Sequence, residues 1–157
     1  MNIEKRLEES LILRLIAVGE ALKRRRDNIC QQLGISSQQW LIMLHLAKDP
    51  NIPIFSREKH RKPMLASEIA RSLDVSRPNV TKLLNVLVEK GLIEQVRDRN
   101  DHRRKRIELS EAGRSLVESL QPMRLQLNEQ LFENFDRGEL QTVLRFLDNC
   151  LSRLEEF

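Results

Sequence analysis

The chain has 157 residues, of which 40% are hydrophobic, 32% are charged and only 4% are aromatic. This composition suits one compact domain with an aliphatic core, and the lack of aromatic side chains for base stacking argues against single-stranded nucleic acid as the main partner. No apolar run approaches the ~18 residues of a membrane span, the first ten residues lack a secretory pattern, and two isolated cysteines imply no disulfide framework. We therefore expect a cytoplasmic protein that does not enter a membrane.

The positive charge is concentrated in one part of the chain. The formal net charge is +4, and it divides into +5 for residues 1–64, +3 for residues 65–110 and −4 for residues 111–157. Residues 97–106 alone hold six basic and two acidic side chains. Locally concentrated positive charge is expected of a surface that binds phosphates, so the acidic C-terminal third is a poor candidate for such a surface.

The first elements in chain order are two helices and a loop. Apolar residues at spacings of three, four and seven predict a helix over residues 3–33. Residues 36–39 are expected to cap a second helix over 38–48, which is apolar almost all round and therefore buried. Residues 49–64 contain three prolines and a basic cluster at 57–62, which predicts an exposed loop. This cluster is either an accessory phosphate contact or disordered.

A pair of short helices and two strands follow. A short helix is predicted over 65–73, and Ser76 is placed to cap the next helix, over 77–90. That helix carries one apolar stripe, made of Val80, Leu83, Leu84, Leu87 and Val88. Strands are expected over 92–97 and 105–110, with Ile107 and Leu109 inward and residues 98–104 as the hairpin tip.

Two long helices complete the chain. They are predicted from residue 110 to about 135 and from about 140 to 154, each with leucines at helical spacing. Together with the first helix they carry more apolar surface than so small a domain can cover. Part of this surface is therefore expected to pack on a second subunit.

Four motifs, in their order along the chain, resemble one protein family. They are SRPNVTKL at residues 76–83, EKGLI at 89–93, DRNDHR at 98–103 and RIELSEAG at 106–113. Together they are similar to the recognition helix, the helix-to-wing turn, the wing and the following helix of the MarR/SlyA family of bacterial transcriptional regulators. The loop at 49–64 is longer and more basic than the family's usual linker.

The resemblance implies a mainly α fold with a small β-wing. It divides the single MarR-like domain, residues 1–157, into dimerisation helices at 1–34 and 111–157 and a winged helix-turn-helix head at 35–110, with the extended basic loop at 49–64. The family's habit also implies a homodimer that binds a pseudo-palindromic operator in duplex DNA, and a small anionic or phenolic effector.

The candidate DNA-binding residues come from the helix over 77–90 and from the wing. Those near the helix start lie off the apolar stripe and can reach base edges or phosphates: Ser76, Arg77, Asn79, Thr81, Lys82 and Asn85. In the wing, Arg103 is the candidate for minor-groove insertion, and Arg99 and Arg104 are candidates for phosphate contacts. Asp98 and Asp101 are expected to brace the arginines and the turn, because carboxylates facing DNA would be repelled. The alternatives are a solvated helix face and a charged loop that keeps the hairpin soluble.

Other residues give weaker signals. Trp40 and His45 on the second helix either border an effector pocket or belong to the core. Cys30 is expected to be an unreactive thiol. The histidines are scattered, so neither a metal site nor a cofactor is expected.

The motifs and the charge pattern therefore predict a DNA-binding transcriptional regulator, and the resemblance implies a ligand-responsive repressor. The alternative is a winged-helix adaptor that binds an acidic protein through its wing. An enzyme is not expected, because the chain shows no Ser/His/Asp set, no glycine-rich phosphate loop and no metal cluster.

Overall fold

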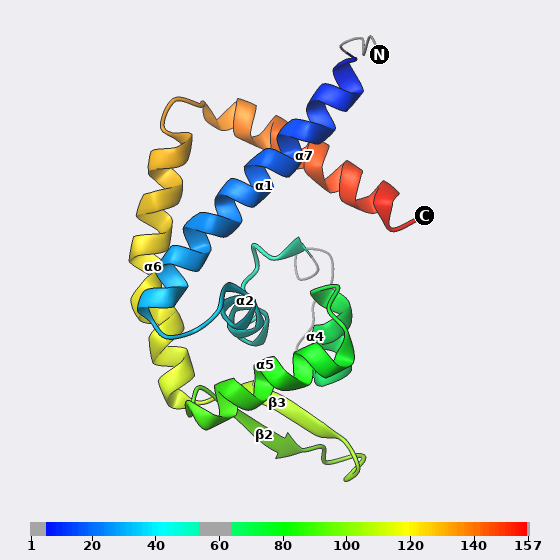
Figure 1. The fold of residues 1–157 in the computed structure, drawn as a ribbon, viewed down its shortest axis with the longest axis vertical. Helices are drawn as coiled ribbons and strands as arrows, with labels where there is room; N and C mark the ends of the chain where they lie inside the picture. The colour runs from blue at the N-terminus through cyan, green and yellow to red at the C-terminus, as the bar shows by residue number, and fades with distance from the viewer. Residues whose placement is uncertain (1–5, 54–63, 157) are drawn as a thin grey trace, which may run out of the picture.

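The computed structural model describes residues 6–53 and 64–156 and is mainly helical (Figure 1). A small antiparallel sheet completes it, which confirms the predicted fold class. Within the described residues, no helix is long and apolar enough to cross a membrane. The elements are α1 (Leu7–Gln32), α2 (Ser37–Leu46), β1 (Met64–Leu65), α4 (Ala66–Ser72), α5 (Arg77–Glu89), β2 (Ile93–Arg97), β3 (Lys105–Leu109), α6 (Glu111–Phe132) and α7 (Arg137–Leu154).

The core of the head, residues 35–110, is built around α2. This helix is apolar almost all round, and Ile42 and Met43 are completely buried. Residues 36–39 cap this helix as predicted, and they do so through a capping box: the Ser36 hydroxyl accepts the Gln39 N–H at 3.1 Å and the Gln39 side chain accepts the Ser36 N–H at 2.8 Å. The other helices and the sheet contribute further buried members of the same cluster: Ile69, Val80, Leu84, Leu87, Ile107 and Leu109.

The apolar stripe of α5 is shorter than predicted. Val80, Leu84 and Leu87 are buried, but Val88 is 40% exposed, so its predicted inward position is wrong. At 3.6 residues per turn, Val88 lies roughly 80° around the helix from Val80, which turns it out of the core. Gly91 follows the end of the helix, with a φ of 67° that a glycine adopts without strain.

The sheet has three strands in the order β1-β3-β2. The β2–β3 hairpin agrees with the predicted strands to within one residue and pairs Ile93 with Leu109 and Arg97 with Lys105. Strand β1 was not predicted, because Met64 had been assigned to the loop and Leu65 to a helix. Met64 pairs with Ile107 instead, which covers the outer edge of β3.

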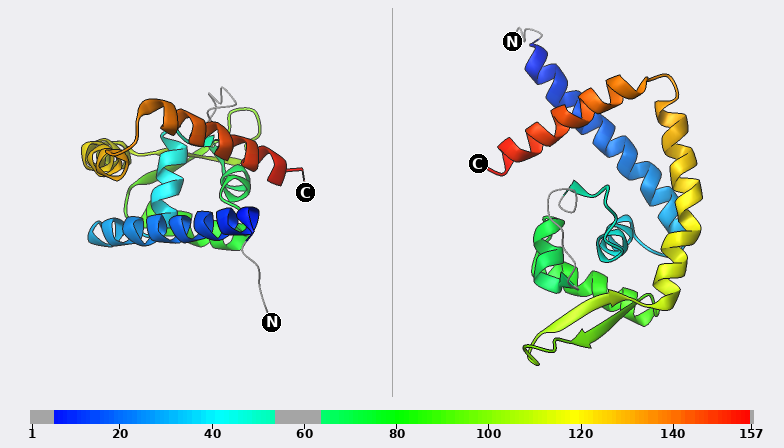
Figure 2. Two further views of the ribbon diagram at one scale, coloured as in Figure 1. Left: turned by 90° about the horizontal axis from the view of Figure 1, so that it is seen from above. Right: turned by 180° about the vertical axis from the view of Figure 1, so that it is seen from behind.

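The stalk, made of α1, α6 and α7, extends away from the head. In Figure 1 α1 and α7 cross, but the view from above in Figure 2 shows that they lie at different depths. Cys30 is the buried residue of α1 and Gly113 that of α6, while α7 has none. Burial raises the pKa of the Cys30 thiol, as expected for an unreactive group. Exposed apolar side chains of the stalk include Leu11, Ile12, Leu13, Ile16, Val18, Leu131, Phe135, Val143, Leu144 and Leu154.

Candidate nucleic-acid interface

The helix-turn-helix is formed by α4 and α5. The turn between them contains Asp74, whose φ of 51° lies in the left-handed region that aspartate tolerates better than most residues. The Val75 N–H donates to the Ala70 carbonyl at 2.9 Å and closes the end of α4. Because Ile69 and Val80 share the head core, the two helices are held in a fixed relative orientation.

A glutamine of α2 is hydrogen-bonded to the backbone of α5. Gln39 is 5% exposed, and beyond its role in the capping box its Nε2 donates to the Leu83 carbonyl at 3.4 Å. The sequence predicts only the capping role of Gln39. Its partner is 44 residues away, so no local pattern indicates this second contact.

All six residues predicted on the reading face of α5 are exposed. Asn79, Thr81, Lys82 and Asn85 point away from the buried Val80 and Leu84, whereas Ser76 and Arg77 are exposed because they stand at the start of the helix. The Thr81 hydroxyl donates to the Arg77 carbonyl at 3.0 Å. The exposed set is Ser76, Arg77, Asn79, Thr81, Lys82 and Asn85.

Ser76 occupies the N-cap position of α5 but does not cap it through its side chain. This corrects the predicted capping bond. The second residue of the helix is Pro78, which has no N–H, so one of the two donors that an N-cap side chain normally bonds is missing. The Ser76 hydroxyl therefore remains at the exposed start of α5.

The wing is a hairpin whose tip covers the predicted residues 98–104. The Asp98 N–H donates to the Arg104 carbonyl at 2.9 Å, and the Arg104 N–H donates to the Asp101 carbonyl at 2.9 Å. These bonds give the tip a defined backbone. The side chains of Arg99 and Arg103 are exposed on it.

Asp98 braces the base of the tip. Its carboxylate accepts the Asn100 N–H at 2.8 Å and the Arg106 Nε–H at 2.6 Å, and the residue is 5% exposed. The Asn100 N–H lowers the pKa of Asp98, burial opposes this, and Arg106 lowers it further, so the net shift is downward. Its ion-pair partner is thus Arg106 on β3, whereas the sequence analysis had not singled out Arg106.

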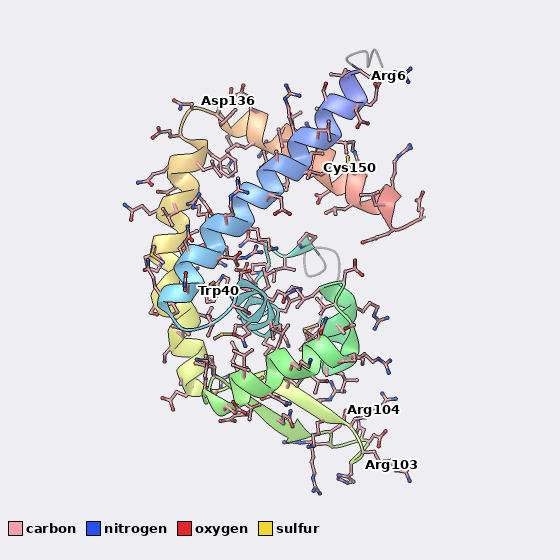
Figure 3. The ribbon with its side chains drawn as sticks, viewed as in Figure 1. Arg6, Trp40, Arg103, Arg104, Asp136 and Cys150 are labelled. Atoms are coloured by element: carbon pink, nitrogen blue, oxygen red, sulfur yellow. The ribbon has the colours of Figure 1, made fainter. Side chains whose placement is uncertain are left out.

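Asp101 holds the turn that carries the outermost arginines. Its carboxylate accepts the Arg103 N–H at 3.1 Å and lies 3.4 Å from the Nε of Arg104. The Arg104 and Asp101 side chains are 63% and 47% exposed, so this ion pair is weak. Figure 3 shows Arg103 and Arg104 at the outer end of the hairpin, away from the stalk.

The reading face of α5 and the wing lie at the same end of the molecule. Figure 1 shows α5 beside the β2–β3 hairpin, and the view from behind in Figure 2 agrees. The start of α1 and the junction between α6 and α7 lie at the opposite end (Figure 1). The helix that carries the exposed polar residues and the arginine-bearing tip of the wing thus lie at one end of the head.

Trp40 and His45, the weak effector candidates, are buried in α2 at 7% and 4% exposure. The His45 Nδ1 lies 2.7 Å from the Leu41 carbonyl, and burial lowers the pKa of His45 against the opposing effect of this hydrogen bond. A cavity of about 300 Å³ lies elsewhere, between α2, β3 and the start of α6. Its lining residues do not include Trp40 or His45: Leu46, Lys48, Met64, Ile107, Glu108, Leu109 and Arg114.

Some predicted features cannot be placed. The basic cluster at residues 57–62 lies outside the described residues. Within the described parts of the chain, no group of three His, Cys, Asp or Glu side chains could hold a metal ion.

The geometry defines a winged helix-turn-helix protein, and comparisons with known proteins agree. Residues 33–104 match the model of the MarR family. The HTH-type transcriptional regulator FarR of Neisseria gonorrhoeae is 27% identical over 83% of this chain and 76% of its own length. The transcriptional activatory protein BadR of Rhodopseudomonas palustris is 26% identical over 96% and 83%.

A solved structure adds to this likeness. The S. aureus MepR–DNA complex has a TM-score of 0.70 and 25% identity to this chain, and the match covers 92% of this chain and 95% of the other. The chain is thus similar to transcriptional regulators of the MarR family over most of its length, as its motifs had indicated.

Proposed function

We propose that this protein is a homodimeric regulator that binds a pseudo-palindromic operator in duplex DNA. The observation that carries the proposal is the shared placement of the exposed polar face of α5 and the arginine tip of the wing at one end of the head. A helix of this kind fits the major groove while a hairpin beside it reaches the flanking backbone and minor groove.

The residues of α5 are proposed to read bases. Asn79 and Asn85 carry amides that suit adenine, and Arg77 carries a guanidinium that suits guanine. Lys82 and the hydroxyls of Ser76 and Thr81 are assigned to phosphates or base edges near the start of the helix.

The wing is proposed to act through its arginines. Arg103 enters the minor groove, where narrow A·T-rich segments concentrate negative potential, and Arg99 and Arg104 contact phosphates. The carboxylates of Asp98 and Asp101 bond within the hairpin, which supports their assignment to bracing.

The stalk is proposed to form the dimer. Residues 1–34 and 111–157 supply it, and the exposed apolar side chains of α1, α6 and α7 support this assignment because a monomer would leave a large apolar surface in water. A two-fold axis would place the two recognition helices in successive major grooves, about 34 Å apart.

We further propose that the protein is a repressor, released by a small anionic or phenolic ligand. The name of BadR describes an activator, so the direction of regulation needs its own test. For a ligand, the cavity lined by Lys48 and Arg114 offers two cations. Trp40 and His45 do not line this cavity.

Selection of duplex DNA by the purified full-length protein, followed by genome-wide mapping of bound sites, tests the proposal. We expect a pseudo-palindromic site whose affinity falls steeply with salt, and a reporter gene under that site should be switched off by the protein. Failure to select any duplex would overturn the proposal. It would favour the alternative of an adaptor that binds an acidic protein through the wing.

A further inference from the structure

The head is joined to the stalk by more than its chain connections. The chain passes from α1 into α2 near residue 35 and from β3 into α6 at Ser110. Between these junctions, α2 contacts both α1 and α6. The orientation of the head therefore depends on what holds the region of α2 against the stalk.

One ion pair bridges this contact far from either junction. The Arg124 Nη2 of α6 lies 2.7 Å from the Asp49 Oδ2, between residues 75 apart in the chain. The Asp49 side chain is 10% exposed and the Arg124 side chain 27%. Shielding from water makes this pair less screened than the exposed Arg104–Asp101 pair of the wing.

Asp49 is fixed rigidly to the head. It lies three residues beyond the end of α2, in the turn where Lys48 takes a φ of 55°, and its N–H donates to the Leu44 carbonyl at 3.2 Å. Its carboxylate also accepts the backbone and side-chain N–H groups of Asn51, at 2.9 and 2.8 Å. A movement of Asp49 thus requires a movement of the α2 end, and α2 is the centre of the head core.

Arg124 lies far from Ser110, where α6 joins the head, so the ion pair is sensitive to small rotations of the head. Arg124 lies fourteen residues beyond Ser110, which corresponds to ~21 Å along a helix. A head rotation of ~5° about Ser110 would displace a group at that distance by ~2 Å, enough to break a hydrogen bond. Bonds near the pivot, such as Ser110 to Gly91, restrain the same rotation much less.

We propose that the Asp49–Arg124 ion pair is a positioning contact that fixes the angle of the head on α6 and thereby the half-site spacing that the dimer accepts. The claim about the head angle concerns a single chain. The claim about the half-site spacing rests on the proposed function, which is a dimer bound to an operator. Loss of either partner leaves a partly buried charge unpaired, which favours rearrangement of the interface.

The pair remains charged near neutral pH. Burial raises the pKa of Asp49, but hydrogen bonds from Asn51 and Arg124 lower it more, so the net shift is downward. The contact is therefore expected to hold the head at any physiological pH rather than to switch with it.

The angle can be measured without DNA. Spin labels at Asn100→Cys on the wing and Glu129→Cys on α6, in a Cys150→Ser background, report the distance between head and stalk by pulsed electron resonance. Both labelled positions are exposed, and the remaining Cys30 is buried. Doubly labelled chains are diluted with unlabelled full-length chains, so that the distances measured lie within one chain.

The proposal predicts a broader or shifted distance distribution for Asp49→Asn and for Arg124→Met, and a distribution close to the parent for Arg124→Lys, which keeps a cation. The control Arg137→Met removes an exposed arginine of α7 and should leave the distribution unchanged. Thermal unfolding checks that each variant is folded. Parent-like distributions for both Asp49→Asn and Arg124→Met would overturn the proposal.

The spacing part is measured on the operator that the parent protein selects. The parent should strongly prefer the native half-site spacing over spacings changed by one base pair, and Asp49→Asn and Arg124→Met should lose this preference several-fold. Affinity for one isolated half-site should stay the same. A parent that selects no duplex contradicts the proposed function, whereas variants that keep the full spacing preference contradict this inference alone.

Discussion

Replacement of Gly113 by alanine tests how closely the stalk is packed on the head. In the interior of an exposed helix, replacement of glycine by alanine raises the free energy of unfolding by roughly 0.5–1 kcal/mol. At Gly113 the added Cβ would lie 2.0 Å from the Leu92 carbonyl oxygen and 3.2 Å from a Leu109 methyl. The nearest atom is backbone, so no rotamer change can relieve the contact, and α6 must move away from the start of β2.

That movement would disturb a small hydrogen-bond network. The Ser110 N–H donates to the Leu92 carbonyl at 3.1 Å, and the Ser110 hydroxyl donates to the Gly91 carbonyl at 2.6 Å and accepts the Gly113 N–H at 3.0 Å. Overpacking costs about 1–3 kcal/mol, and each weakened hydrogen bond about 1 kcal/mol. Gly113→Ala should therefore lower the free energy of unfolding by about 2–4 kcal/mol.

Urea unfolding followed by circular dichroism measures this change as a lower midpoint at an unchanged slope. Gly19→Ala in α1 is the control, because among the described residues its added Cβ would meet no atom within 4 Å apart from the neighbouring backbone of its own helix. That variant should be neutral or slightly more stable. A Gly113→Ala protein as stable as the parent would refute the close packing of α6 on β2.

Three further predictions concern the interface, the stalk and the wing. Arg103→Ala should weaken operator binding at least tenfold, about 1.4 kcal/mol. Parent-like binding by this variant in fluorescence anisotropy would contradict the minor-groove role of Arg103. Asn79→Ala should instead relax the base preference at one operator position by ~1–3 kcal/mol. Removal of residues 140–157 should give monomer or aggregate in light scattering, and a soluble dimer would refute the assignment of α7. Because the pKa of Asp98 is lowered on folding, its stabilising contribution is present above its unfolded-state pKa of about 3.9 and is lost as the pH falls through the lower folded-state value. The free energy of unfolding should therefore fall less steeply with decreasing pH for Asp98→Asn than for the parent protein. Identical curves would show that the contacts of the Asp98 carboxylate contribute nothing to stability.

The parts of the fold that sequence could predict are those with local signals. The capping pair Ser36 and Gln39, the glycine at 91 and the leucine spacing of the long helices all lie within a few residues of the structure they cause. Strand β1 escaped prediction because two residues are too few for an alternating pattern. Val88 was wrongly predicted to be buried, because the predicted apolar stripe was wider than the part of the helix surface that the core covers.

The exposed residues of the candidate interface could also be predicted, because helix geometry decides which side chains lie opposite a stripe. The long-range partners of the residues that support them could not. Asp98 holds Arg106 across the hairpin, Gln39 holds Leu83, and Asp49 holds Arg124 across 75 residues. Such partners depend on strand register and on helix packing, which no short stretch of sequence specifies.

A count of charges in the sequence is limited in the same way, because it does not show which basic side chains are paired in the fold. Residues 97–106 contain six basic side chains, but the structure divides them by role. Arg106 is 24% exposed and bonded to Asp98, whereas Arg104 is 63% exposed and only weakly paired with Asp101. If Arg106 contributes little, the segment offers about five phosphate contacts, and its share of the log–log salt slope should be ~4.5 rather than ~5.4. Arg106→Ala should accordingly change that slope less than Arg99→Ala, although it loosens the hairpin. Measurement of affinity from low to high salt for the two variants decides the point, and equal losses of slope would mean that Arg106 leaves Asp98 when the DNA is bound.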